Sequence, residues 1–290
     1  MVIENKDDMK CAPDKDFSNG SCITPEILLE MARSYNEEFP NEKPIKCNFD
    51  EKKLILKPKQ IKKYLIGEFY SRLKKVCSTQ KCWMKQNFIR RMNKEIKEQL
   101  TRFTFRPDGP AGTFQWLTTL HINDVMDQYH NKYDDFLFLG AVPMDFDNLK
   151  YLGLRNINLE ELYDEGKKQI GIVFNLDDHD EPGSHWVGMY SNLEKGQIYY
   201  FDSYGIKPEK RVRKFMNRIN KYMKNKKMKN IDVQYNKKRH QYGHSECGVY
   251  SLNFILRILN GTSFDDLTTN KTTDSEVAKC RNVYFISDKK

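Results

Sequence analysis

The stretch GSHWVGMYSNLEKGQIYYFDSYG, residues 183–205, decides the fold of the larger part of this chain. Its apolar runs HWVGMY and QIYYFD have the length of strands, and the turn-forming cluster SNLEKG separates them, so the stretch predicts a β-hairpin. His185 then stands at the start of one strand and Asp202 at the end of the next. Because hairpin strands are antiparallel, these two ends lie side by side.

A second stretch supplies a nucleophile. Cys247 opens the apolar run GVYSLNFILRILNG, which is closed by Gly261 and predicts a buried helix. A thiol at a helix N-terminus lies at the positive end of the helix dipole, which favours the thiolate. A thiolate, an imidazole base and a carboxylate that orients the base are what acyl transfer by a cysteine requires. Gln241, six residues before Cys247, can donate its side-chain amide to an oxyanion together with the Cys247 backbone N–H.

The order and spacing of these residues resemble a known family. The sequence has H-W at 185–186, D-S at 202–203 and Q-x5-C-G from 241 to 248. This pattern is similar to that of the adenovirus protease and SUMO-specific protease superfamily of cysteine peptidases. Two segments extend the resemblance, which covers roughly residues 112–262: WLTTLHINDVMDQY (116–129) resembles the opening of the family's catalytic domain, and FLFLGAVPMDFD (136–147) resembles its viral branch, which includes African swine fever virus and giant-virus proteases.

The resemblance implies a fold, an activity and a substrate. The fold is of the α+β class, with a mixed β-sheet packed against the helix that carries the nucleophile. The implied activity is a cysteine endopeptidase that cleaves after small residues, of Gly-Gly-X type, in viral core or capsid precursor polyproteins during virion maturation. A narrow tunnel that admits glycines would be walled by tryptophan, and Trp186 and Trp116 are the residues expected near it. No cofactor and no metal are implied.

Other interpretations of the same residues stay open at this point. A protease acting on host SUMO or ubiquitin conjugates would use the same site, and so would an acetyltransferase of related fold. A non-enzymatic binding module would require that at least one of the three residues be replaced, whereas His185, Asp202 and Cys247 are all present. Taken singly, Cys247 is a candidate structural thiol and His185 and Asp202 are ordinary strand-end residues. His179, in the loop DDHDEPG, is a rival base without the H-W pattern.

Composition indicates a second, smaller part of the chain. Residues 52–106 carry 17 basic and 3 acidic residues, whereas residues 107–290 carry 26 and 25. We expect a helical, basic N-terminal region over 1–105, a Pro/Gly linker over 106–112 and a catalytic domain over 113–290. Residues 206–240 form a further basic zone, with 14 basic and 2 acidic residues. Solvated helix faces account for such charge, and so does non-specific DNA binding through residues 52–106.

Apolar spacing places the elements of both parts. Helices are expected from Thr24, as N-cap, to Phe39, from 57 to 76 and from 82 to 103, where Ile89, Met92, Ile96, Leu100 and Phe103 share a face. A further amphipathic helix is expected within 207–225. Strands are expected at 136–142, 171–176 and 231–235, with a last short one at 283–286.

Cysteine usage and hydropathy bear on the compartment. Seven cysteines, an odd number, argue against a secreted disulfide framework, and the five in the first third lack the paired spacing of a zinc module. No apolar run of 18 residues and no leader-like segment is present, so no membrane association is expected. The chain is expected in the host cytoplasm, at the virus factory, and in the virion. The oligomeric state is not predicted.

Overall fold

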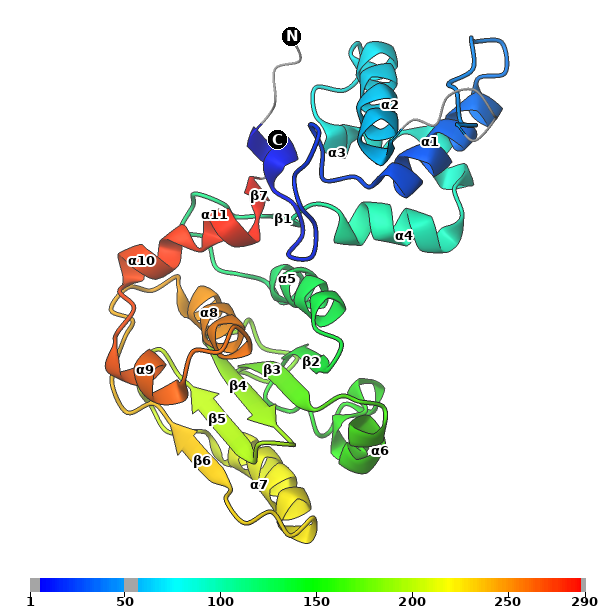
Figure 1. Cartoon of the computed structure of the whole chain (residues 1–290). Helices are drawn as coiled ribbons and strands as arrows, with labels where there is room; N and C mark the ends of the chain where they lie inside the picture. Colours follow the sequence, from blue (N-terminus) through cyan, green and yellow to red (C-terminus); the bar gives the residue numbers. More distant parts are fainter. Residues whose placement is uncertain (1–5, 50–56, 288–290) are drawn as a thin grey trace. The chain divides into compact units, whose positions relative to one another are not determined.

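The computed structural model describes residues 6–49 and 57–287 of the 290-residue chain (Figure 1). Contacts between Cα atoms divide the chain into two compact units, Met1–Pro107 and Asp108–Lys290. No helix in the described ranges is both long and apolar enough to cross a membrane.

A five-stranded mixed sheet is the centre of the second unit (Figure 1). In sheet order the strands are β2 (Phe136–Val142), β3 (Gln169–Asn175), β4 (Trp186–Asn192), β5 (Gln197–Phe201) and β6 (Asp232–Tyr235). β4 is antiparallel to both of its neighbours, whereas the outer pairs β2–β3 and β5–β6 are parallel. The predicted hairpin is confirmed as β4 and β5, and the start of β4 therefore lies at the same sheet edge as the ends of the other four strands.

Helices cover both faces of this sheet. On one face lie α5 (Thr119–Lys132), α8 (Cys247–Leu259) and α9 (Phe264–Thr269), which share one apolar core with the sheet. On the other face, α6 (Leu159–Asp164) and α7 (Lys210–Asn225) share a second core with it. The expected α+β fold, with a mixed sheet against the helix that begins at Cys247, is confirmed.

Two glycines allow α8 to approach its neighbours closely. A Cβ at Gly188, in β4, would lie 2.9 Å from the Phe254 ring and 3.4 Å from the Ser251 carbonyl oxygen of α8. A Cβ at Gly248, directly after Cys247, would lie 3.0 Å from Leu117 Cβ. The first turn of α8 is thereby fixed between the central strand and the segment that precedes α5.

Short elements complete the second unit. Two 3₁₀ turns, η3 (Lys150–Leu152) and η4 (Leu154–Asn156), precede α6. After α9 the chain forms α10 (Asp274–Lys279), α11 (Arg281–Tyr284) and β7 (Ile286–Ser287), which pairs in parallel with β1 (Asp108–Gly109).

The strand predicted over 283–286 is wrong in its first half. Val283 and Tyr284 end helix α11, with Val283 exposed and Tyr284 buried, and only Ile286 of the predicted range is in a strand. A run of four apolar residues fits the end of a helix as well as a short strand, so its composition does not separate the two.

The first unit is helical. Its longer helices are α1 (Pro25–Glu38), α2 (Pro58–Leu73) and α4 (Lys94–Phe103). Shorter ones are η1 (Lys6–Met9), α3 (Gln80–Trp83) and η2 (Asn87–Arg91). Thr24 caps α1 as predicted, by accepting a hydrogen bond from the Ile27 N–H.

The single helix predicted over 82–103 is wrong, because the range holds the end of α3, the 3₁₀ helix η2 and, after a break at Asn93, the separate helix α4. The Asn93 side chain accepts hydrogen bonds from the backbone N–H groups of Glu95 and Ile96 and so starts α4. Asparagine favours such N-caps over helix interiors because its side chain competes for backbone groups. The apolar spacing continues across the break, so spacing alone does not show it.

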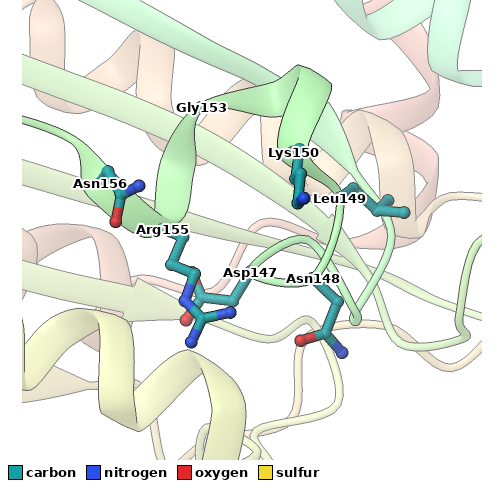
Figure 2. Close-up of a pocket in the computed structure, with 7 residues that line it drawn as sticks. All are labelled: Asp147, Asn148, Leu149, Lys150, Gly153, Arg155 and Asn156. Atoms are coloured by element: carbon teal, nitrogen blue, oxygen red, sulfur yellow. The ribbon is translucent and has the colours of Figure 1, made fainter.

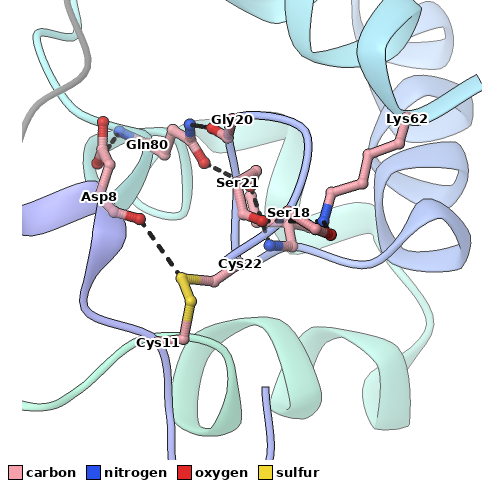
Figure 3. The surroundings of a disulfide bond; sticks show 9 residues. Asp8, Cys11, Ser18, Gly20, Ser21, Cys22, Lys62 and Gln80 are labelled. Atoms are coloured by element: carbon pink, nitrogen blue, oxygen red, sulfur yellow. Dashed lines mark hydrogen bonds between the residues drawn. A yellow bond between two sulfur atoms is a disulfide. The ribbon is translucent and has the colours of Figure 1, made fainter. Parts of the chain in front are cut away.

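Four cysteines of the first unit form two disulfides, Cys11–Cys22 and Cys77–Cys82. Figure 3 shows how buried polar side chains hold the loop that carries Cys22: Gln80 donates to the Gly20 carbonyl and Lys62 to the Ser21 carbonyl. The odd cysteine count argued against a secreted disulfide framework, and the two pairs found here are local, joining residues 11 and 5 positions apart. An odd number of cysteines is compatible with such local pairs, because the three remaining cysteines stay free.

The packing of α8 on β4 gives a first testable prediction. Gly188→Ala should lower the free energy of unfolding by about 1–3 kcal/mol, because the new methyl overlaps the Phe254 ring. Gly67→Ala is the matched control. Nothing lies within 4 Å of a Cβ built at this position in α2, so the change should raise stability by about 0.5–1 kcal/mol. Urea unfolding of both variants measures this, and equal stability of the two would contradict it.

Candidate active site

His185 and Asp202 meet at the centre of the sheet edge. His185 directly precedes β4, and Asp202 directly follows β5, whose last residue pairs with Gly188. The His185 Nε2 atom lies 2.8 Å from Asp202 Oδ1, and both side chains are buried. The same carboxylate oxygen accepts the backbone N–H of Tyr204 at 2.8 Å. The hydrogen bond fixes the orientation of the imidazole, as acyl transfer requires of a base.

Asn236 holds Asp202 in place from the neighbouring strand. It directly follows β6 and is buried. Its side-chain oxygen accepts the Asp202 N–H at 2.8 Å, and its amide nitrogen donates to the Asp202 carbonyl at 2.6 Å. This pair of bonds replaces strand pairing just beyond the ends of β5 and β6. Asn236 was not predicted as a site residue, because no local pattern in the sequence distinguishes it from a turn asparagine.

Cys247 is the first residue of α8, and its side chain interacts with His185 and contributes to raising the pKa of that imidazole. Because Nε2 faces Asp202, Nδ1 is the ring nitrogen left for the thiol. Burial lowers the pKa of His185, but hydrogen bonds to Asp202 and Cys247 and the charges of both raise it to about 9. At neutral pH the imidazole is therefore protonated, which is the state that pairs with a thiolate.

The other two free cysteines lie in different surroundings. Burial raises the pKa of both Cys47 and Cys280, and partners only partly offset it. Both thiols are therefore held in the neutral, less nucleophilic form. Of the three free cysteines, Cys247 alone makes a hydrogen bond with a histidine in the described part of the chain.

The N-terminus of α8 is not capped by a side chain. Glu246 occupies the cap position but makes no side-chain bond to the helix amides. Its carboxylate instead accepts from Arg281 Nε at 3.0 Å and from the Ser245 hydroxyl at 2.9 Å. The amides of the first turn are thus left to stabilise negative charge on Cys247 or on a substrate. Arg281 follows Glu246 by 35 positions, so the sequence carries no local signal for this ion pair.

Gln241 is fully buried beside the Asp202 loop. Its Oε1 accepts the Ser203 hydroxyl at 2.6 Å, and its Nε2 donates to the Gly243 carbonyl at 3.0 Å. Its backbone N–H also donates to the Ser203 carbonyl at 2.9 Å. A primary amide has two hydrogens, so one remains for a substrate oxygen. The structure thus fixes the orientation of the amide, while its role as oxyanion donor stays a prediction.

The two predicted tryptophans line one pocket of about 570 Å³ next to His185. Trp186 is buried and its Nε1 donates to the Leu117 carbonyl at 2.9 Å, which ties β4 to the segment before α5. Trp116 is 47% exposed and lies on the pocket's rim, as does Tyr151. The lining also includes Gly183, two residues before His185, and Leu117, which packs against Gly248 directly after Cys247.

His179 lines the same pocket but lies apart from the thiol. Its Nδ1 is 2.6 Å from Asp145 Oδ2, and its side chain is 53% exposed. The hydrogen bond to Asp145 is the main cause that raises the pKa of His179. The structure thus contains a second His–Asp pair, but Cys247 bonds to His185 and not to it.

A second pocket, of about 360 Å³, contains none of the predicted site residues. Figure 2 shows its lining, with Asp147 and Arg155 close together below η3 and η4. Arg218 of α7 reaches the same loop, where it donates to the Asp147 carboxylate at 2.8 Å and to the Arg155 carbonyl at 2.9 Å. These contacts stabilise the connection between β2 and α6. The residues that line this pocket do not include a nucleophile paired with a base.

Comparison with known proteins agrees with this geometry. Residues 165–289, which include His185, Asp202, Gln241 and Cys247, match the Ulp1 protease family, C-terminal catalytic domain. A protein of Acanthamoeba polyphaga mimivirus described as a thiol protease is 39% identical over 280 residues, which cover 95% of this chain and 92% of the relative. A cysteine protease of African swine fever virus is 28% identical over 204 residues, 65% of this chain and 74% of the relative.

A crystal structure of an African swine fever virus protease superimposes with a TM-score of 0.64 at 21% identity, and the alignment covers 96% of each chain. That likeness shows a shared fold. The mimivirus relative, aligned over nearly the whole chain, shows the family. The chain therefore belongs to the Ulp1 family of cysteine proteases and has relatives in mimivirus and African swine fever virus.

Proposed function

We propose that this cysteine protease cleaves after Gly-Gly in viral core or capsid precursor polyproteins during virion maturation. It acts in the host cytoplasm, at the virus factory, and in the virion. The observation that carries the substrate proposal is the pocket walled by Trp116 and Trp186 beside His185. Glycine lets a peptide backbone pass between two aromatic walls, whereas a Cβ substituent would meet them. The relatives in mimivirus and African swine fever virus support a viral substrate.

The proposed mechanism assigns one step to each side chain. The Cys247 thiolate attacks the carbonyl carbon of the scissile bond, and the oxyanion accepts hydrogen bonds from Gln241 Nε2 and the Cys247 N–H. The His185 imidazolium gives its proton to the leaving amine, which completes the acyl-enzyme. Neutral His185 then takes a proton from water, the hydroxide attacks the thioester, and Cys247 leaves as the thiolate. Asp202 stabilises the imidazolium whenever it forms.

A second candidate substrate is a ubiquitin-like protein. Some relatives from African swine fever virus isolates are described as SUMO-1 cysteine proteases. Such substrates also present a flexible glycine-containing C-terminus, so the same pocket would admit them. The two candidate substrates differ in what the glycines are attached to, namely an extended polyprotein or a folded ubiquitin-like domain.

Substrate mapping separates the two candidates. Purified enzyme should cut Gly-Gly-containing core or capsid precursors directly after the second glycine, as mapped by mass spectrometry of the fragments. Cys247→Ser, a change of one atom at the thiol, is the matched control and should cut nothing while unfolding at the same urea concentration as the parent. Release of SUMO from a conjugate, with the precursors left intact, would contradict the proposal in favour of the second candidate.

The pKa of His185 gives a prediction for the pH profile. Since the imidazolium is needed and its pKa is about 9, kcat/KM should fall as pH rises through about 9. Asp202→Asn removes a charge and a hydrogen bond that raise this pKa, so the high-pH limb should move to lower pH. His179→Gln is the control and should leave the limb in place. If the high-pH fall of kcat/KM shifts in the His179 variant and not in the Asp202 variant, His179 is the base.

We further propose that the basic N-terminal unit binds DNA without sequence preference. Many of its cations are exposed, as far as the described residues extend: Lys57, Lys59, Lys63, Lys74, Lys75, Lys85, Arg90 and Lys94. Others are engaged, since Arg72 pairs with Glu68 and Lys62 is buried against Ser21. Lys52 and Lys53 belong to the same basic region but lie outside the described residues. A polyanion would neutralise the exposed cations, and it would retain the enzyme near packaged nucleic acid.

A salt titration of fluorescent duplex DNA tests this proposal on the full chain. Affinity should fall steeply with salt, and replacing four exposed cations of the N-terminal unit (Lys59, Lys63, Lys74 and Lys75) by Gln should weaken binding and reduce the salt slope. Replacing Lys221 and Lys224, exposed on α7, serves as the charge control. No binding at low salt, or loss only in the control, would contradict the proposal.

A further inference from the structure

Arg239 is held between two aromatic rings at the edge of the active site. It lies in the segment that joins β6 to α8, is exposed, and its guanidinium carbon is 4.9 Å from the centre of the Tyr204 ring and 5.0 Å from that of Tyr242. Its Nε donates to the Gln241 carbonyl at 2.6 Å. Two cation–π contacts and a hydrogen bond restrict a side chain that would otherwise move freely in solvent.

The Arg239 guanidinium is connected to the His185 imidazole through the Tyr204 ring, which contacts both. The Tyr204 ring stacks on the His185 imidazole, with centroids 4.6 Å apart and planes at 14°. Arg239 packs on Tyr204 in turn, and it bonds to the backbone of Gln241, the predicted oxyanion donor. A group bound by Arg239 would therefore lie beside the reacting bond and not on a remote surface.

The terminal nitrogens of Arg239 have no carboxylate partner among the described residues. Three other arginines of this unit have one: Arg211 pairs with Asp178, Arg218 with Asp147 and Arg281 with Glu246. Asp274, near the Arg239 segment, accepts instead from the backbone N–H groups of Tyr242 and Gly243. A fixed guanidinium with free terminal nitrogens fits a carboxylate that arrives with a ligand.

Sheet topology places opposite charges on the two sides of His185. The loop that follows β3 carries Asp177, Asp178, Asp180 and Glu181 and borders the pocket of Trp116 and Trp186. The segment that follows β6 carries Lys237, Lys238 and Arg239, beyond Asp202. A substrate that crosses this edge therefore meets acidic side chains on one side of the scissile bond and basic ones on the other.

We propose that Arg239 binds the side-chain carboxylate of a Glu or Asp in the first three residues after the scissile bond. The inference rests on the proposed function, in which the glycines before that bond fill the tryptophan-walled pocket. The residues of the leaving amine then pass over Tyr204, on the side of the imidazole that protonates them. Arg239 thereby selects substrates by the charge that follows Gly-Gly.

Paired peptides test the proposal on the full-length enzyme. The peptides are otherwise identical, end in a C-terminal amide so that only a side chain can supply a carboxylate, and carry Glu, Gln or Lys at the first, second or third position after Gly-Gly. For the parent enzyme, kcat/KM should favour Glu at one of these positions by roughly three- to tenfold, as for a partly exposed charge-assisted pair. Arg239→Gln should abolish the preference, and Arg239→Glu should make the enzyme favour Lys there.

Lys237→Gln is the matched control. It removes one charge from the same segment, where the Lys237 ammonium lies over Tyr235, and it should keep the preference for Glu. If Arg239→Gln lowers kcat/KM equally for the Glu and Gln peptides, Arg239 is only structural and the inference is wrong. A preference for Glu before Gly-Gly that depends on Arg239 would also overturn it. Failure to cleave any Gly-Gly peptide would instead overturn the proposed function, and this inference with it.

Discussion

The close approach of α8 to β4 is the constraint on which the active-site geometry depends. Gly188 leaves no side chain between the strand and the helix, so Ser251 and Phe254 pack directly on the β4 backbone. Cys247 lies one helical turn before Ser251, whose hydroxyl donates to the Cys247 carbonyl at 3.0 Å. The thiol is thereby brought to the start of β4, where His185 stands. Hydrogen bonds weaken within a few tenths of an ångström, so a displaced helix would separate the pair.

The loops around Asp202 make the rest of the site one hydrogen-bonded unit. Asn236 binds both backbone groups of Asp202, and Ser203 binds Gln241 through its hydroxyl and through its carbonyl. The segment that carries Gln241 is therefore attached to the segment that carries Asp202. Buried polar networks of this kind are stable only when their members are satisfied together, which links the position of Gln241 to that of His185. His185 and Gln241 are in this way positioned by the same two strand ends.

Local patterns in the sequence predicted the parts of the site that rest on local structure. His185 and Asp202 flank a hairpin whose period and turn residues are evident, and Cys247 opens an apolar run of helix length. The parts that depend on contacts distant in sequence were not predictable. Asn236 and Arg281 look like ordinary turn and surface residues until the fold brings them to Asp202 and Glu246.

Competition between equally local signals explains the errors. Around Asn93 the apolar spacing indicated a continuous helix, but the asparagine side chain satisfies the first amides of a new one. The physical chemistry of each residue taken singly did not indicate a common role. The resemblance to a known family did, because it placed four residues in the family's order: His185, Asp202, Gln241 and Cys247.

The ion pair of Glu246 and Arg281 resolves an electrostatic conflict at the nucleophile. A carboxylate directly before Cys247 would oppose a thiolate, and as an N-cap it would occupy the amides of α8. Arg281, 1% exposed, neutralises this carboxylate and directs it away from the helix. Removing one partner of a buried pair costs about 3–5 kcal/mol, so the arrangement is strongly held even where its net contribution to stability is small. The positive end of α8 thus stays available to the two negative charges of the reaction, the thiolate before attack and the oxyanion after it.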